Sequence, residues 1–335
     1  MAAAMIKAIH FKNYKCLRDT TLPLGRLTIL VGPNGSGKST ALEALTLAHL
    51  RVATSSLTAG VLIDPEHEVR VEIEWAPPYS DWRSNKRLTH QGSRGLAHWD
   101  AGGHAHDNTD LAVTLAATRV YSLDATELCG AVPLVPNIEL NPRGKGLAGV
   151  LDRLRDDHPE RWEALNEEFG RWLPEFDRIL FDTPAKGERA LKLRTRVGQH
   201  GIPARDISQG TLLALAILTL AYLPEPPPII GLEEPGRGIH PRLLRDVRDA
   251  MYRLAYPESA GEQRDPVQVV ATTHSPYLLD LFRDHPEEIV IADKIEGNVR
   301  FRRLTDIPKY EEILGEAALG EVWYSGILGG VPADR

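Results

Sequence analysis

The sequence predicts an α/β fold built on a mostly parallel sheet. The chain has 335 residues, of which 42% are hydrophobic and 25% charged, which suits one large globular domain that carries an insertion. Short apolar runs typical of buried strands alternate with helical segments, and this alternation indicates a parallel sheet covered on both faces. The net charge is −7, so any contact with nucleic acid must use a local basic patch.

The composition indicates neither export nor a membrane span. Two cysteines, Cys16 and Cys129, are too few for a disulfide framework. The longest apolar run, residues 211–223, is much shorter than the roughly 20 residues that cross a bilayer, and the first residues lack the apolar core of a signal peptide. We therefore expect a cytoplasmic protein with no membrane partner.

The first strands lead into a glycine-rich turn. Residues 6–11 alternate as in a half-exposed strand, and residues 27–31 form an apolar run that ends at Gly32. Helix-forming residues at helical spacing follow at 41–50. This part of the chain therefore predicts a buried strand, a glycine-rich turn and a helix.

The middle of the chain predicts a strand, a loop and two helices. Residues 69–75 alternate strictly, as in a strand with one solvated face. From 76 to 110 the pattern breaks into Pro, Gly, His, Asn and Asp, so we expect a long flexible surface loop. Residues 146–173 regain helical spacing in two pieces that end at Pro174, which predicts a small amphipathic helix pair.

Histidines and aspartates are frequent in the expected loop, yet they do not predict a metal site. Their spacing matches no ligand pattern and their flanks are rich in glycine. The residues concerned are His90, His98, Asp100, His104, His106, Asp107 and Asp110.

The second half of the chain repeats the alternation of helix and strand. An apolar helix at 212–223 is closed by the proline-rich residues 224–228, and a buried strand follows at 229–232. An amphipathic helix at 241–255 precedes a further buried strand at 267–271. Two more strands of the parallel sheet are thus expected here.

A phosphate loop lies between the strand and the helix near the start of the chain. Residues 32–40 fit the pattern G-x-x-x-x-G-K-[ST] in the context that it requires. Backbone N–H groups and the positive end of the helix would cradle bound phosphates, Lys38 would contact the β and γ phosphates, and Ser39 would bind Mg²⁺. An incidental glycine-rich turn is the alternative. The predicted nucleotide-binding residues are Gly32, Pro33, Asn34, Gly35, Ser36, Gly37, Lys38, Ser39 and Thr40.

Acidic and histidine side chains follow two of the predicted strands. Glu233 and Glu234 end the strand at 229–232, and His274 closely follows the strand at 267–271. Both strands should end at the sheet edge where ligands bind. Glu233 would hold Mg²⁺ through water, Glu234 would act as the general base, and His274 would contact the γ-phosphate or the attacking water. Two solvated acids are the alternative for the glutamate pair.

Four motifs occur in a fixed order: 32–40 (GPNGSGKST), 207–218 (ISQGTLLALAIL), 229–241 (IIGLEEPGRGIHP) and 271–280 (ATTHSPYLLD). Together they resemble the head of an ABC-superfamily ATPase, in particular the RecF/SMC-like AAA ATPases of DNA-maintenance and anti-phage proteins. The tail at 319–330 also resembles this group.

The resemblance implies a P-loop NTPase of the ABC (RecF/SMC head) type, with a mostly parallel sheet and an inserted strand/helical subdomain. It also implies one discontinuous ATPase domain spanning 1–335. The core would comprise 1–56 and 196–335, and the insertion would comprise 57–195.

By the same resemblance Ser208, Gln209 and Gly210 occupy the signature motif. In this superfamily the signature contacts the γ-phosphate of ATP bound by another subunit, which implies an ATP-dependent head-to-tail homodimer. A plain N-cap is the alternative for Ser208. Residues 236–240 fall where the D-loop crosses such an interface, with His240 where transporters usually carry Asp.

The sequence also departs from the pattern. Gln91 and Gln199 are poorly placed for a Q-loop, and Tyr14 is only a weak candidate for the adenine contact. No heptads extend far enough for a long coiled coil, and no acidic Toprim-type cluster follows His274. We therefore expect an ATPase head without arms or a nuclease domain.

Three functions fit the resemblance. The first is DNA maintenance or repair, in which hydrolysis acts as a conformational switch on bound DNA. The second is regulation of a separately encoded effector, such as the nuclease of an anti-phage system. A transporter subunit is disfavoured because the signature lacks LSGGQ.

Overall fold

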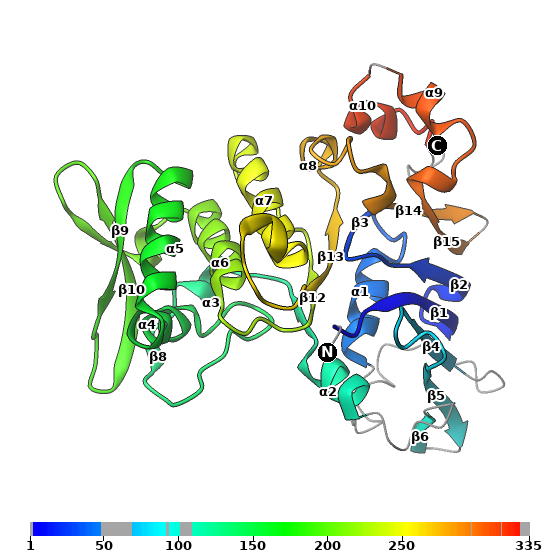
Figure 1. Cartoon of the computed structure of the whole chain (residues 1–335), viewed down its shortest axis with the longest axis horizontal. Helices are drawn as coiled ribbons and strands as arrows, with labels where there is room; N and C mark the ends of the chain where they lie inside the picture. Colours follow the sequence, from blue (N-terminus) through cyan, green and yellow to red (C-terminus); the bar gives the residue numbers. More distant parts are fainter. Residues whose placement is uncertain are drawn as a thin grey trace. The chain divides into compact units, whose positions relative to one another are not determined.

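The computed structural model describes residues 3–47, 69–91, 94–100, 109–295, 297–315 and 317–328. The chain divides into two compact units, and the chain passes between them several times. The first unit comprises Met1–Val120, Pro227–Glu233 and Ala255–Arg335, and the second comprises Tyr121–Pro226 and Glu234–Leu254. Most helices and strands of each unit are labelled in Figure 1.

A six-stranded sheet forms the centre of the first unit. Its strand order is β15-β14-β3-β13-β12-β7, and β3 pairs in parallel with both β13 and β14, as β12 does with β13. Every residue of β3, β12 and β13 is buried, which explains their continuous apolar runs. The strands are β3 (Leu27–Val31), β7 (Arg119–Tyr121), β12 (Ile229–Leu232), β13 (Gln268–Thr273), β14 (Ile289–Ile295) and β15 (Asn298–Arg303). The predicted α/β P-loop fold with a mostly parallel sheet is confirmed.

The first unit also contains an antiparallel sheet with the strand order β2-β1-β4-β5-β6. Alternate residues of β4 are buried, as strict alternation predicts. The strands are β1 (Ile6–Tyr14), β2 (Leu17–Pro23), β4 (Val69–Trp75), β5 (Arg83–Gln91) and β6 (Arg94–Asp100).

The prediction of a loop at 76–110 is wrong over much of that range. Residues 83–91 and 94–100 form the antiparallel hairpin of β5 and β6, and β5 pairs with β4. Backbone pairing to a neighbouring strand, which polar residues also permit, stabilises this hairpin without an apolar alternation. His104, His106 and Asp107 lie outside the described residues.

A buried glutamine joins the two sheets of the first unit. The side-chain oxygen of Gln268 in β13 accepts a hydrogen bond from the N–H of Ile6 at 2.8 Å. Its amide nitrogen donates to the carbonyls of Ile6 at 2.7 Å and Gly25 at 2.8 Å. All polar atoms of this buried amide are engaged, which fixes β1 against β13.

Short helices complete the first unit. Helix α1 (Lys38–Leu47) contacts β12 and β13, and α10 (Leu319–Tyr324) packs on α8 (Pro276–Asp280). The N–H of Gly320 donates to the Asp280 carboxylate at 2.6 Å, which ties these two helices together. The remaining helices are α2 (Thr109–Ala117) and α9 (Tyr310–Leu314). No helix among the described residues of the chain has the length and apolar character needed to cross a membrane.

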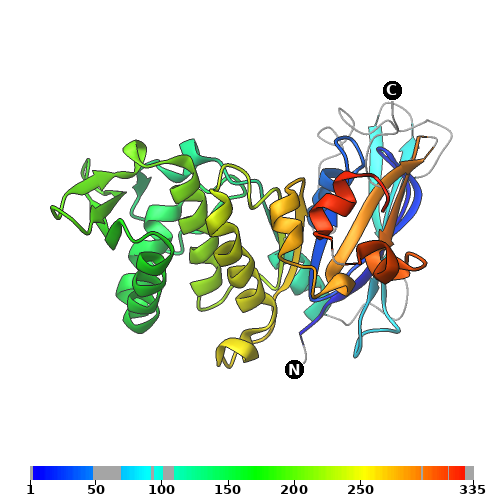
Figure 2. The same ribbon diagram turned by 90° about the horizontal axis from the view of Figure 1, so that it is seen from above.

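Helices dominate the second unit. Helices α4 (Leu147–Asp157) and α5 (Pro159–Trp172) form the pair that helical spacing predicts, and α5 also packs against α6 (Gln209–Tyr222). Figure 2 shows these helices, coloured green to yellow, side by side. The other elements are α3 (Ala125–Leu128), β8 (Val132–Pro133), β9 (Phe176–Asp182), β10 (Glu188–Thr195), β11 (Gly201–Pro203) and α7 (Leu244–Ala255).

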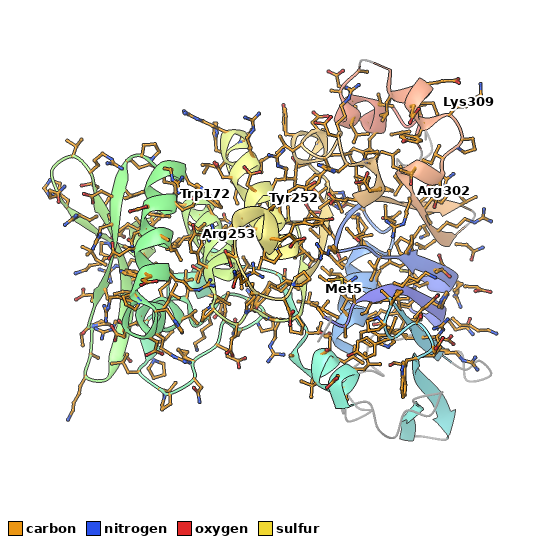
Figure 3. All side chains as sticks on the ribbon, in the orientation of Figure 1. Met5, Trp172, Tyr252, Arg253, Arg302 and Lys309 are labelled. Atoms are coloured by element: carbon orange, nitrogen blue, oxygen red, sulfur yellow. The ribbon has the colours of Figure 1, made fainter. Side chains whose placement is uncertain are left out.

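An arginine on α7 holds that helix against α6. Arg253, labelled in Figure 3, donates to the Tyr222 hydroxyl at 3.0 Å, and its guanidinium lies 4.0 Å from the centre of the Tyr222 ring. Tyr222 lies in the last turn of α6, whose residues from 211 to 222 are all buried. The contact anchors the end of α6 opposite the predicted signature.

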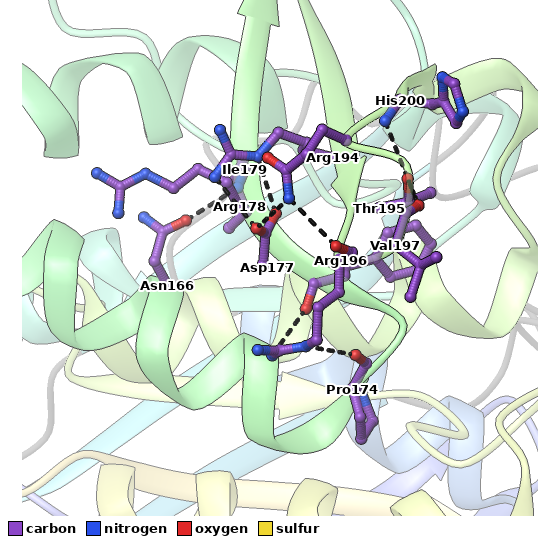
Figure 4. Close-up of polar contacts among 12 residues, drawn as sticks. Asn166, Pro174, Asp177, Arg178, Ile179, Arg194, Thr195, Arg196, Val197 and His200 are labelled. Carbon is purple, nitrogen blue, oxygen red and sulfur yellow. Dashed lines mark hydrogen bonds and ion pairs between the residues drawn. The ribbon is translucent and has the colours of Figure 1, made fainter.

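A polar network secures the hairpin of β9 and β10 (Figure 4). The Asp177 carboxylate accepts hydrogen bonds from Arg194 Nε at 2.9 Å and from its terminal nitrogen at 3.1 Å. Gln199 donates to the same carboxylate at 3.2 Å, and Arg196 Nε donates to the carbonyl of Pro174 at 2.8 Å. The hydrogen bonds from Arg194 hold the pKa of Asp177 below its ordinary value.

Candidate nucleotide site and signature surface

The phosphate loop joins β3 to α1, as its sequence pattern predicts. Lys38 is only 5% exposed, and its ammonium group donates to the carbonyls of Gly32 at 2.8 Å and Pro33 at 2.9 Å. Ser36 is buried and its N–H donates to the Pro33 carbonyl at 3.2 Å. The loop therefore curls around the lysine, with Asn34 on its exposed side.

Two glycines of the loop are required by its geometry. Gly37 has φ +86°, and a Cβ there would lie 2.8 Å from the Leu17 side chain. A Cβ on Gly32 would lie 2.2 Å from the carbonyl oxygen of Ala292. Because larger residues fit neither position, the glycines of the motif satisfy a steric need as well as a phosphate-binding one.

The first turn of α1 carries the remaining loop residues. Ser39 is exposed there, so its hydroxyl is accessible to a cation. Thr40 is half-buried, and its hydroxyl oxygen lies 3.7 Å from the sulfur of Cys16. An inward-curled backbone, a lysine and an accessible hydroxyl form a donor set that suits a triphosphate with Mg²⁺.

The sheet brings the other predicted residues of the first unit to the same edge as the loop. Strands β3, β12 and β13 are parallel, so their carboxyl ends share one edge. Gly32 follows β3, Glu233 follows β12, and His274 follows β13. Glu233 and His274 are both half-exposed.

Glu234 has an unusual backbone. Its φ is +47°, in the left-handed region that residues other than glycine seldom adopt. Such strain persists only where surrounding structure imposes it, and it is frequent at functional sites. One segment of the first unit ends at Glu233, and a segment of the second unit begins at Glu234. The strained residue therefore lies where the chain passes from one unit to the other.

The predicted signature lies at the start of α6 in the second unit. Ser208 is the N-cap, and its hydroxyl accepts a hydrogen bond from the N–H of Thr211 at 3.2 Å. Both Ser208 and Gln209 are exposed. Ser208 therefore acts as an N-cap. Because Ser208 and Gln209 are exposed, the N-terminus of α6 lies on the surface of its unit, with its first N–H groups and positive dipole accessible.

The segment expected to be the D-loop, residues 236–240, packs directly on this signature. A Cβ on Gly210 would lie 2.5 Å from the carbonyl oxygen of Gly238, and one on Gly238 would lie 3.6 Å from the Gln209 side chain. His240 caps the next turn, because its Nδ1 accepts from the N–H of Arg242 at 3.2 Å. Signature and D-loop therefore form one continuous surface of the second unit.

Two family models match the chain. A model described as "AAA domain, putative AbiEii toxin, Type IV TA system" matches residues 133–280. One described as "AAA ATPase domain" matches residues 5–52, which contain the phosphate loop. Both descriptions name AAA domains, so these matches support the resemblance to ABC-superfamily ATPases of the RecF/SMC-like type.

Solved structures support the fold of this chain. It superposes on the Smc head domain of Pyrococcus furiosus, solved with an extended coiled coil bound to the C-terminal domain of ScpA, with a TM-score of 0.61 and 14% identity over 93% of this chain and 99% of that one. For the SMC head domain of Thermotoga maritima the TM-score is 0.51, with 14% identity over 90% of this chain and 99% of that one. The head architecture is therefore shared at low sequence identity.

Two curated proteins are similar in sequence to this chain. An OLD nuclease of Thermus scotoductus is 25% identical over 337 residues, covering 87% of this chain. UvrABC system protein A of Deinococcus radiodurans is 25% identical over 267 residues, covering 71% of this chain. This chain spans 62% of the length of the first relative and 25% of the second.

The three residues weighed for the adenine contact or for a Q-loop have other places in the fold. Tyr14 is fully buried, its ring is stacked on Phe11 at 6.1 Å, and burial raises the pKa of its phenol. Tyr14 is therefore a core residue, poorly suited to stacking on adenine. Gln199 donates to Asp177 in the β10 hairpin network, and Gln91 ends β5. Arg237, which the sequence analysis did not weigh, is exposed within the segment expected to be the D-loop.

Proposed function

We propose that the ATPase binds ATP with Mg²⁺ at residues 32–40 and hydrolyses it. The convergence of the phosphate loop, Glu233 and His274 at one sheet edge carries this proposal. Lys38 would bind the β and γ phosphates, and Ser39 and Glu233 would hold Mg²⁺, Glu233 through water. Bound Mg²⁺ would neutralise charge on the phosphates.

Glu234 is the proposed general base, and His274 the proposed contact to the γ-phosphate or the attacking water. Removal of a proton from water needs a carboxylate fixed close to the reacting oxygen. The left-handed backbone of Glu234 supports this role, because its cost must be compensated by the surrounding structure. A plain solvated acid at a strand end has no need of such a conformation.

We propose further that two copies bind head to tail around two ATP molecules. The exposed signature, Ser208, Gln209 and Gly210, would contact the γ-phosphate held by the other copy. The capped helix N-terminus supplies N–H groups and a positive dipole suited to an anion. The D-loop would lie in the same interface, because it packs on Gly210.

The ATP cycle would serve as a conformational switch in DNA maintenance or repair, with DNA as a partner of the dimer. Regulation of a separate anti-phage effector, such as a nuclease, is the second candidate. Two comparisons favour this candidate: the relative matched over 87% of this chain is named OLD nuclease, and one family model is described as a putative AbiEii toxin. Co-purification of DNA or of an effector protein from the native host would distinguish the two.

The variant Glu234→Gln tests the ATPase and the dimer together. It keeps the size of the side chain but removes the base, so ATP should bind while the turnover rate falls at least about 100-fold. The trapped nucleotide should convert the protein to a dimer with Mg-ATP and leave it monomeric without. Light scattering with and without nucleotide measures this change. Undiminished turnover would exclude Glu234 as the base.

A second variant tests the signature on the same background. Ser208→Arg places a bulky cation at the positive end of α6, so the ATP-dependent dimer should be lost. Binding of ATP to the phosphate loop of the same chain should survive, and calorimetry measures it. A dimer that forms regardless of nucleotide or of either change would show that association uses another surface.

A further inference from the structure

The surface around the signature carries exposed arginines. Arg237, Arg242 and Arg245 are all exposed, and within the described parts of the chain none forms an ion pair within 4.0 Å. Asp246 lies close enough to attract Arg242 and Arg245, since both oppose the rise in its pKa that burial causes. Arg237 directly precedes Gly238, whose carbonyl oxygen packs on Gly210 of the signature.

The backbone of Arg237 is fixed by two consecutive turns. Its N–H donates to the carbonyl of Glu234 at 2.9 Å, and the N–H of Ile239 donates to the carbonyl of Gly236 at 3.2 Å. Gly238 follows with φ +75°, a conformation that suits glycine. The side chain of Arg237 therefore starts from a defined position, one residue before the carbonyl that contacts Gly210.

We propose that Arg237 contacts the triphosphate of ATP bound by a second copy of the chain. The inference rests on the proposed head-to-tail dimer and adds a residue to its composite site. Ser208 and the α6 N-terminus offer only a hydroxyl and partial charges, whereas a triphosphate is a compact polyanion. A guanidinium binds phosphate oxygens in a bidentate manner and stabilises the charge on a transferring phosphoryl group.

The charge pattern favours a nucleotide over a nucleic acid as the ligand. Along α7 the arginines alternate with acids, because Arg248 pairs with Asp249 at 2.6 Å and Asp246 lies near Arg245. Binding along a DNA backbone requires a basic stripe that continues over many phosphates. An arginine beside the signature, followed by a helix of mixed charge, matches a single compact anion better.

Arg237→Ala provides the first test, on the Glu234→Gln background. The protein concentration needed for half-maximal dimer with Mg-ATP should rise at least about tenfold, while binding of ATP by the dilute monomer should change less than twofold. For Arg237→Lys this concentration should lie between those of the parent and of Arg237→Ala. Arg153→Ala, an exposed arginine on α4 in the same unit, is the matched control and should leave dimer formation unchanged.

Mixing two inactive variants decides whether Arg237 acts on the other copy. A dimer of Lys38→Ala with Arg237→Ala contains one site with an intact loop and an intact arginine from the partner copy. The mixture should therefore hydrolyse ATP several-fold faster than the sum of the two variants alone. If Arg237 acted on its own chain, no intact site would form and the mixture would show no gain.

The outcomes separate the two proposals. A parent protein that never dimerises with ATP would overturn the proposed dimer itself. A parent that dimerises while Arg237→Ala does so equally well would overturn only the role of Arg237. Arg237→Ala could instead lose binding to a short DNA duplex in the absence of ATP and still dimerise with ATP. That result would assign Arg237 to nucleic acid and would likewise overturn the inference.

Discussion

Gly210 and Gly238 approach so closely that a Cβ on Gly210 would lie 2.5 Å from the carbonyl oxygen of Gly238. The obstructing atom belongs to the backbone, so it cannot move aside as a flexible side chain would. The contact couples the first turn of α6 to the D-loop, and it requires glycine at position 210.

Gly210→Ala should separate the signature from the D-loop. We expect the ATP-dependent dimer and ATP turnover to fall at least about tenfold, because two parts of one surface would no longer be aligned. Binding of ATP to the phosphate loop should persist. The matched control is Gly201→Ala, where an added Cβ meets only the Lys192 side chain at 3.8 Å. Equal dimer formation by the two variants, measured by light scattering, would contradict this expectation.

Lys38→Ala should weaken ATP binding at least about 100-fold, because it removes the positive charge from the centre of the loop. The lysine also donates to two loop carbonyls, so the loop itself should lose some order. Calorimetric titration with ATP measures the affinity, and thermal unfolding of the same sample checks the fold. Unchanged affinity would rule out the proposed phosphate site.

Gln268→Ala should lower the free energy of unfolding by about 3 kcal/mol or more, because it leaves the buried backbone groups of Ile6 without partners. Urea unfolding measures the change. Gln199→Ala serves as the control, since its amide donates at an exposed site and its loss should cost less than about 1 kcal/mol. A similar cost for both variants would mean that the amide does not hold β1 against β13.

The Asp177 carboxylate should make stability depend on pH. Its pKa in the folded chain is below the ordinary value of about 4, so its contribution is present above that pH and is lost as the pH falls through the lower value. The urea midpoint of Asp177→Asn should therefore lie below that of the parent at pH 7. The difference should shrink towards zero in acid. A difference that stays constant down to pH 2 would refute the assignment.

Periodicity predicted the buried parts of the fold well. Strands β3, β12 and β13 are apolar throughout because both faces are covered, and α5 shows its buried stripe in the spacing of Trp162, Leu165 and Phe169. The hairpin of β5 and β6 was missed, because pairing with β4 and not burial determines where it forms. Its polar residues resemble those of a loop.

The positions that form the candidate site were predictable where they belong to motifs and unpredictable where they depend on proximity in the fold. The phosphate-loop pattern located Lys38, and the ends of two apolar runs located Glu233 and His274. The left-handed backbone of Glu234 leaves no trace in the sequence. Arg237 is marked only by the glycines on either side of it, and its position beside the signature depends on packing between segments distant in sequence.

The place of β3 in its sheet has a consequence for biosynthesis. Both of its neighbours, β13 and β14, come from the last third of the chain. While the ribosome is still making the second unit, the strand that leads into the phosphate loop has two unpaired edges. Such edges invite pairing with other nascent chains, so a chaperone that shields them should raise the yield of active protein. The proposed nucleotide site can thus form only after β13 and β14 have been made, although its motif is made well before them.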